Sequence, residues 1–158
     1  MCPVEDRSED IKLRRLDIIG SDLSHISPDI LAQAVVRLEE IKVATKLTPH
    51  QVEGIFNKIA DCENFALKRL NMYRKDLSSV PAEVVEKVIS SMETVDLRFA
   101  LLTPAQINNI FTLVAERKSS KLRKVHFWKN DLSSVPEGLR ERAMNNISVL
   151  LTFKAEII

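Results

Sequence analysis

The chain is 158 residues long with a net charge of +1, and its residues are 45% apolar and 28% charged, the balance of an ordinary folded domain. Near-neutral charge gives no argument for nucleic acid or a membrane surface as a partner, and three glycines are too few for a glycine-rich phosphate loop. The two cysteines, Cys2 and Cys62, do not make a disulfide framework, so reduced thiols in a cytoplasmic protein are expected.

Residues 1–12 form a polar lead without the apolar run of a signal peptide. From Leu13 onward, apolar residues recur at relative positions 0, 3, 5 and 10, as in Leu122, Val125, Phe127 and Leu132. The units begin at residues 13, 38, 67, 92, 122 and 147, and their spacing alternates between 25 and 29 or 30 residues. The second unit lacks one residue near its end, and the sixth is degraded. This self-similarity predicts a repeat domain over residues 13–158.

Each unit opens with alternating apolar residues, which predicts a strand of four or five residues, and each of the first five units continues into a helix. Thr48-Pro49-His50-Gln51 and Thr103-Pro104-Ala105-Gln106 predict helix starts with capping boxes. Apolar residues at offsets 0, 3, 4 and 7 from Val52 and from Ile107 turn one face of each helix inward. The other helices are predicted to begin at Pro28, Pro81 and Pro136. The apolar residues expected on their inner faces are Ile30, Leu31, Ala34 and Val35, then Val84, Val85, Val88 and Ile89, then Leu139, Ala143 and Met144.

A nearly identical phrase precedes two of these helices. Asp76-Leu77-Ser78-Ser79-Val80-Pro81 returns as Asp131-Leu132-Ser133-Ser134-Val135-Pro136, and Asp22-Leu23-Ser24 opens a looser first copy. Its position between strand and helix, and its Ser and Pro residues, predict a loop with Leu77 and Leu132 buried. The repetition of this phrase is therefore interpreted as structural.

Repeated strand–helix units require parallel strands joined by right-handed crossovers. The predicted fold is α/β, a short horseshoe with about six parallel strands on the concave face and about five helices on the convex face. The spacing Leu-x-x-Leu-x-Leu-x-x-Asn-x-Leu, clearest from Leu122 to Leu132 with Asn130, resembles a leucine-rich repeat. The alternating unit lengths are similar to the ribonuclease-inhibitor-like subclass, which also forms the repeat arms of nucleotide-binding leucine-rich-repeat innate immune receptors. The resemblance implies recognition of a protein partner without catalysis, in an intracellular immune setting.

The sequence departs from this pattern at the Asn position, where the side chain normally satisfies loop backbone groups between successive turns. Only Asn130 keeps the amide there. The other units have Ser21, Lys46, Lys75, Ala100 and Ala155. Helix capping and core packing are therefore expected to hold the turns together.

Relative positions 2, 4 and 6 of each unit are predicted to point out from the concave face, with position 7 at its rim. This strip has eight basic residues against three acidic ones (Asp17, Glu40 and Asp96), and it contains the only Tyr and the only Trp of the chain. Arginines beside exposed aromatic rings are typical of protein interfaces. The predicted partner-binding residues are Arg15, Arg69, Tyr73, Arg74, Arg98, Phe99, Lys124, His126, Trp128, Lys129 and Phe153.

Several alternatives stay open. The strip side chains could pack on one another, or the chain could be an adaptor that forms a homodimer through an apolar C-terminal edge strand, residues 149–157, or a substrate-receptor arm of an enzyme complex. Contact with a nucleic acid backbone is disfavoured because the chain has no nucleic-acid motif. No catalytic residue, metal or cofactor is expected, since His25, His50 and His126 have no metal-ligand spacing and Cys62 has no neighbouring histidine.

Overall fold

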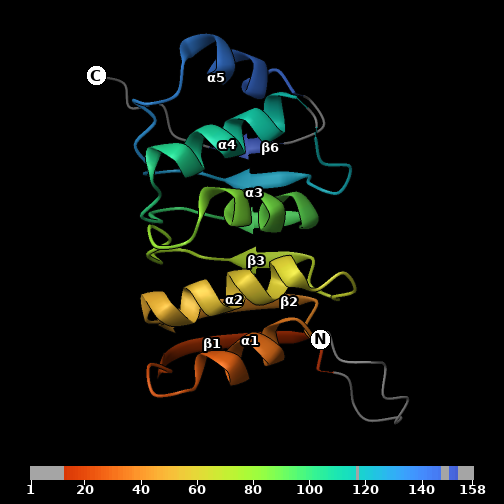
Figure 1. Ribbon diagram of the computed structural model, residues 1–158, viewed down its shortest axis with the longest axis vertical. Coiled ribbons are helices and arrows are strands. Elements are labelled where there is room, and N and C mark those ends of the chain that lie inside the picture. The colour runs from red at the N-terminus through yellow and green to blue at the C-terminus, as the bar shows by residue number, and fades with distance from the viewer. Residues whose placement is uncertain (1–12, 117, 147–149, 153–158) are drawn as a thin grey trace.

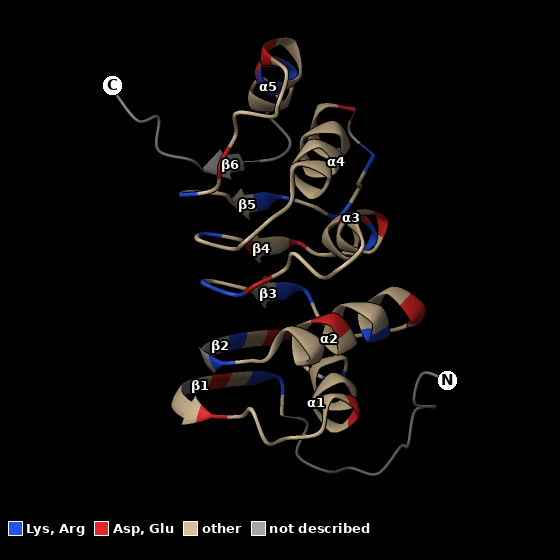
Figure 2. Ribbon diagram, turned by 60° about the vertical axis from the view of Figure 1, so that its left-hand side comes forward, with Lys and Arg blue, Asp and Glu red and all other residues tan. Residues whose placement is uncertain are grey.

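The computed structural model describes residues 13–116, 118–146 and 150–152. Strands and helices alternate throughout this part of the chain. In order, the elements are β1 (Arg15–Asp22), α1 (Pro28–Val35), β2 (Glu40–Lys46), α2 (Pro49–Asp61), β3 (Arg69–Asn71), α3 (Ala82–Ser91), β4 (Thr94–Asp96), α4 (Pro104–Ala115), β5 (Lys124–His126), α5 (Glu137–Met144) and β6 (Leu150–Thr152). The strands form one parallel sheet in the order β1-β2-β3-β4-β5-β6. The helices lie together on one side of this sheet (Figures 1 and 2), so the fold is α/β with two layers.

Equivalent positions of successive units lie side by side in the sheet. Arg15 pairs with Glu40, Glu40 with Arg69, Arg69 with Thr94, and Thr94 with Lys124. All of these residues occupy relative position 2, so the predicted register is confirmed from the first to the fifth strand. In the sixth unit the prediction is wrong by one residue, because Lys124 pairs with Leu150 and not with Val149.

Residues at relative positions 3 and 5 form the core between the sheet and the helices. Leu70 and Val125 are buried, and Met72, Leu97 and Phe127 are 0% exposed. Burying each such large apolar side chain stabilises the fold by about 1.5–3 kcal/mol. The first unit is less well covered, since Leu13 is 59% exposed.

The strands are of two lengths. β1 has 8 residues and β2 has 7, whereas each of the later strands has only 3, so the prediction of four or five residues is wrong for all of them. The register between β1 and β2 shifts between Ile19 and Asp22. At this irregularity β1 accommodates one residue more than β2, which is the residue missing from the second unit. Gly20 lies there with φ +75°, a conformation that glycine adopts without a steric penalty.

Both predicted capping boxes are present. The Thr103 hydroxyl accepts a hydrogen bond from the Gln106 N–H at 3.3 Å, and Gln106 Oε1 accepts one from the Thr103 N–H at 2.7 Å. Gln106 Nε2 also donates to the carbonyls of Leu77 and Val80 at 2.7 and 2.6 Å. One buried side chain therefore caps α4 and satisfies the loop of the preceding unit.

The same arrangement recurs at α2. Gln51 Nε2 donates to the carbonyls of Leu23 and Ile26, both at 2.7 Å, while Gln51 Oε1 accepts from the Thr48 N–H at 2.9 Å. Helix capping thus satisfies loop carbonyls between neighbouring units, as expected for a chain whose Asn position is mostly substituted. The inner faces predicted for α2 and α4 are buried as well.

The three shorter helices depart from the prediction in detail. Pro28 begins α1, but Pro81 and Pro136 occupy the N-cap positions of α3 and α5. Ile30 and Met144 were expected inside and are 65% and 53% exposed, and Ala34 is exposed too. In a helix of eight residues, the spacing of apolar residues does not determine which face turns inward, because a small rotation about the helix axis moves residues at the edge of the apolar face from buried to exposed.

The repeated Asp-Leu-Ser phrase is a turn. In each copy the Asp carboxylate accepts a hydrogen bond from the backbone N–H two residues later: Asp22 from Ser24, Asp76 from Ser78 and Asp131 from Ser133, each at 2.9 Å. These N–H groups lower the pKa of the Asp22 and Asp131 carboxyls, because they stabilise the ionised form.

The leucines of the phrase are buried to different degrees. Leu77 is 0% exposed, as predicted, but Leu132 is only half-buried.

Cys62, the C-cap residue of α2, is buried and disulfide-bonded. Its partner lies outside the described residues. The expectation of reduced thiols is therefore wrong for Cys62. Disulfides of this kind are common in oxidising compartments and rare in the cytosol.

Candidate binding face

The strand ends share an unusual backbone conformation. Gly20, Arg74, Phe99 and Lys129 all occupy relative position 7 and have φ of 75°, 56°, 55° and 63°. Non-glycine residues seldom adopt this left-handed region. The turns are joined through the backbone, because the Arg74 N–H donates to the Arg98 carbonyl at 3.0 Å. Three successive units thus place a large side chain at the same edge of the sheet.

Three aromatic side chains meet at this edge. The ring centroids of Tyr73 and Phe99 are 5.6 Å apart at 87°, and those of Phe99 and Trp128 are 5.3 Å apart at 71°. Edge-to-face pairs of this kind contribute about 0.5–1.5 kcal/mol each beyond their burial. Each ring is half-buried. We call Tyr73, Phe99 and Trp128 the aromatic row.

Cations cover the aromatic row. The Arg74 guanidinium lies 5.2 Å from the Tyr73 ring centroid and 5.3 Å from that of Phe99. The Lys129 ammonium lies 5.8 Å from the Trp128 ring. Arg74 is exposed and forms no ion pair with any described residue. Figure 2 shows basic residues at the turns after β3, β4 and β5, so positive charge accompanies the row along its length.

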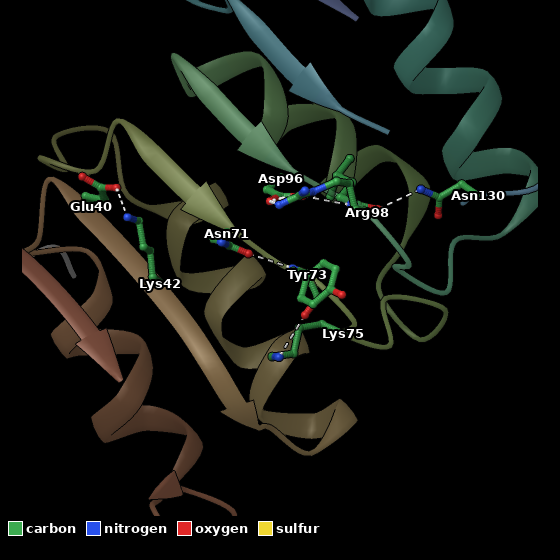
Figure 3. Close-up of polar contacts among 9 residues, drawn as sticks. Glu40, Lys42, Asn71, Tyr73, Lys75, Asp96, Arg98 and Asn130 are labelled. Carbon is green, nitrogen blue, oxygen red and sulfur yellow. Dashed lines mark hydrogen bonds and ion pairs between the residues drawn. The ribbon is translucent and has the colours of Figure 1, made fainter. Parts of the chain in front are cut away.

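Strand residues fix the orientation of the row. Asp96, which is 8% exposed, accepts from Arg98 Nη2 at 2.6 Å and from Arg98 Nε at 2.9 Å. This bond raises the pKa of Arg98. The Arg98 guanidinium also lies 5.4 Å from the Tyr73 ring, and Asn71 Oδ1 accepts from the Tyr73 N–H at 2.9 Å (Figure 3). Arg98 therefore supports the row, and its charge is compensated by Asp96.

Two of the predicted binding residues lie in a different cluster. Arg15, Lys42 and Arg69 approach the Glu40 carboxylate at 3.4, 3.6 and 3.1 Å. The Glu40 side chain is only 15% exposed. Figure 3 places Glu40 and Lys42 apart from Tyr73 and Arg98. Three cations of the first three strands thus share one carboxylate, which orders their side chains and leaves the cluster with a net charge of +2.

Lys124 and His126 lie on β5, and both are half-buried. Burial and the Lys124 ammonium lower the pKa of His126, while Asp96 on the neighbouring strand opposes that shift. The neutral imidazole is therefore favoured at neutral pH, and His126 adds no charge to the face.

Phe153, also predicted to bind a partner, lies outside the described residues, as do residues 149 and 153–157 of the proposed edge strand and the polar lead 1–12. The prediction that Phe153 extends the row therefore stays a prediction.

Two residues at the Asn position satisfy loop carbonyls in different ways. Asn130 Nδ2 donates to the carbonyls of Leu97 and Phe127 at 2.7 and 2.9 Å, which joins β5 to the turn of the preceding unit (Figure 3). Lys75 occupies the same position in the third unit, and its ammonium donates to one carbonyl, that of Tyr73, at 3.1 Å. It is 6% exposed and lines a groove that the strand pattern did not predict. The sequence did indicate this groove in one way, because Lys75 stands at the Asn position, where a buried amide side chain is usual.

Among residues 13–116, 118–146 and 150–152, no group of His, Cys, Asp and Glu could hold a metal ion, and no helix is long and apolar enough to cross a membrane. Comparisons of the chain with protein-family models, with curated proteins and with solved structures found no match. Its function must therefore be inferred from its own residues.

Proposed function

We propose that the chain is a short leucine-rich-repeat module of the ribonuclease-inhibitor-like type, a horseshoe without catalytic activity, that recognises a protein partner through the aromatic row. The contact of Tyr73, Phe99 and Trp128 across three units, with Arg74 and Lys129 beside them, carries this proposal. Tyr, Trp and Arg are the residues most enriched at energetic hot spots of protein interfaces. The sequential parallel strands and the one-sided helices support the repeat interpretation.

The partner surface that fits this face is acidic. Arg74 is exposed at the edge of the row and has no carboxylate among the described residues within ion-pair distance. An acidic side chain placed there gains charge-assisted hydrogen bonds that the free protein lacks. The apolar rings beneath would contact the partner's non-polar groups.

A single-stranded nucleic acid fits less well. The three rings pack edge-to-face against one another at 5.6 and 5.3 Å, so no base can stack between them. An intracellular immune setting follows from the resemblance, and an adaptor or substrate-receptor role would use the same face.

Binding to a displayed library of acidic peptides tests the proposal. Peptides selected on the wild-type chain should bind the double variant Arg74→Glu/Lys129→Glu at least about tenfold more weakly, because each reversed charge removes an attraction and adds a repulsion. Arg37→Glu/Arg142→Glu, a reversal at two exposed residues on the helix side, is the matched control. Charge reversal is preferable to Trp128→Ala, which would also remove the ring contact with Phe99.

Three outcomes would overturn the proposal. The selected peptides could bind both double variants equally well, a single-stranded oligonucleotide could bind better than any peptide, or sedimentation could show self-association that blocks the row. The compartment needs a separate measurement. The disulfide of Cys62 is the observation that speaks against the cytosol. Alkylation of thiols in freshly lysed source cells should leave Cys62 unmodified if the protein resides in an oxidising compartment, and an alkylated Cys62 would favour the intracellular setting.

A further inference from the structure

A groove of about 890 Å³ opens at the carboxyl ends of β1, β2 and β3. Its walls are the segments after these strands: residues 20–24, 46–48 and 73–76. The groove exists because β1 and β2 continue for several residues beyond the point where the 3-residue strand β3 ends. Its volume lies within the range of about 300–1,000 Å³ that is usual for small-molecule sites.

The lining of the groove has three basic residues and two acidic ones, Asp22 and Asp76, a net charge of +1. Lys75, Lys46 and Arg74 line it, and so does Thr48, the N-cap residue of the 13-residue helix α2. A helix N-terminus carries partial positive charge that favours anions. Lys75 is the most informative of these residues, because it is 6% exposed and the only hydrogen bond of its ammonium goes to the Tyr73 carbonyl. An ammonium group has three donors, so two of them remain available in the groove.

The carboxylates of the groove do not neutralise Lys75. Asp22 accepts from the Ser24 N–H at 2.9 Å, and Asp76 accepts from the Ser78 N–H at 2.9 Å and from the Ser78 hydroxyl at 2.6 Å. Each acid is thus hydrogen-bonded within its own turn, and the charge of Asp22 acts on Lys46, which helps to lower the pKa of Asp22. Neither lies within ion-pair distance of the Lys75 ammonium. A buried charge without a counter-charge is costly to retain and is frequent at functional sites.

We propose that this groove is a binding site for a small anion, with Lys75, Lys46 and Arg74 as the cationic groups that contact its carboxylate or phosphoryl oxygens. The anion would supply the counter-charge and the acceptors that Lys75 lacks. Tyr73 and Arg74 belong both to the groove and to the neighbourhood of the aromatic row. The groove nevertheless stands on its own observations and does not require the proposed protein partner.

Titration of the full chain with inorganic phosphate at constant ionic strength tests the site, followed by the backbone amide signals in nuclear magnetic resonance spectra. Saturable shifts are expected at residues 20–24, 46–48 and 73–76. In Lys75→Met and in Lys46→Met, binding should weaken by at least about tenfold, since each loses a charged donor. Lys87→Met, which changes an exposed lysine of α3, should bind like the wild type.

A parallel titration with acetate identifies the group that is bound. Stronger binding of phosphate points to a phosphoryl ligand, and equal binding points to a carboxylate. Shifts that do not saturate, or shifts that persist unchanged in Lys46→Met and Lys75→Met, would overturn the proposal. Lys46→Met alone decides the matter if Lys75→Met does not fold, because Lys46 is exposed. Lys129→Glu should leave phosphate binding intact, so failure of the aromatic row and failure of the groove can be told apart.

Discussion

Replacement of Gln106 by alanine is expected to cause a large loss of stability from a single polar side chain. Gln106 is 0% exposed, and its Nε2 donates to the carbonyls of Leu77 and Val80 at 2.7 and 2.6 Å. In Gln106→Ala the Val80 carbonyl loses its donor, which costs about 1–3 kcal/mol for a buried unsatisfied group. The Leu77 carbonyl loses one hydrogen bond, worth about 1 kcal/mol, but keeps the one from the Val80 N–H. The capping interaction with Thr103 is lost as well, at about 1 kcal/mol. The expected decrease in the free energy of unfolding is about 3–5 kcal/mol.

Urea denaturation followed by circular dichroism measures this decrease, and Asn108→Ala is the matched control. Asn108 is on the same helix and also donates from its amide to two carbonyls, those of Pro104 and Ser134, but in an exposed setting. Its loss should therefore cost no more than about 1 kcal/mol. Gln106→Glu keeps the shape but directs oxygen toward two carbonyls, so it should destabilise at neutral pH at least as much as alanine does. Equal effects of Gln106→Ala and Asn108→Ala would refute the idea that Gln106 holds neighbouring units together.

Two further substitutions probe other buried polar groups. Burial lowers the pKa of Lys75 below 10.5, so the unfolded chain binds more protons between the folded pKa and 10.5, and stability should rise with pH across that interval. Denaturation at a series of pH values should show this rise in the wild type and not in Lys75→Met. Asn130→Ala should lower the free energy of unfolding by about 1–3 kcal/mol, because the Phe127 carbonyl loses its donor and the Leu97 carbonyl keeps only the Ala100 N–H; a thermal melt unchanged from that of the wild type would contradict this.

Periodicity predicted the sheet well because burial of one strand face determines register. Leu70, Val95 and Val125 had to lie in one layer, and the pairing of five strands follows from that. The sixth unit was misplaced because Val149, Leu150 and Leu151 are all apolar, so two registers satisfy the pattern equally. The capping boxes were readable from four consecutive residues each.

The candidate site was harder to predict because its contacts join residues that are far apart in the sequence. Glu40 and Arg69 are 29 residues apart, and nothing in either unit indicates that three cations share one carboxylate. The alternation of apolar residues along each strand predicted that Tyr73 and Trp128 point away from the core. It cannot predict that Phe99, in a left-handed turn, brings its ring between theirs. The groove depends on strand length, and strand ends are set by turn geometry that short apolar patterns do not contain.

The left-handed residue at each strand end connects stability with the proposed binding face. Gly20 shows what this position demands of the backbone alone, because a Cβ added there would meet no atom within 4 Å. Gly20→Ala should therefore lower the free energy of unfolding by about 1 kcal/mol through conformation only. Gly138→Ala, within helix α5, should instead raise it by up to about 1 kcal/mol.

Opposite signs for these two variants, measured by urea denaturation, would establish that the position is strained for any other residue. Arg74, Phe99 and Lys129 adopt the same conformation, so each would then be retained against a measurable backbone penalty. Strain that persists at three equivalent positions, all of them at the aromatic row, is best explained by a requirement for those side chains on the face. If Gly20→Ala left stability unchanged, the conformation would carry no penalty, and this support for the binding face would be lost.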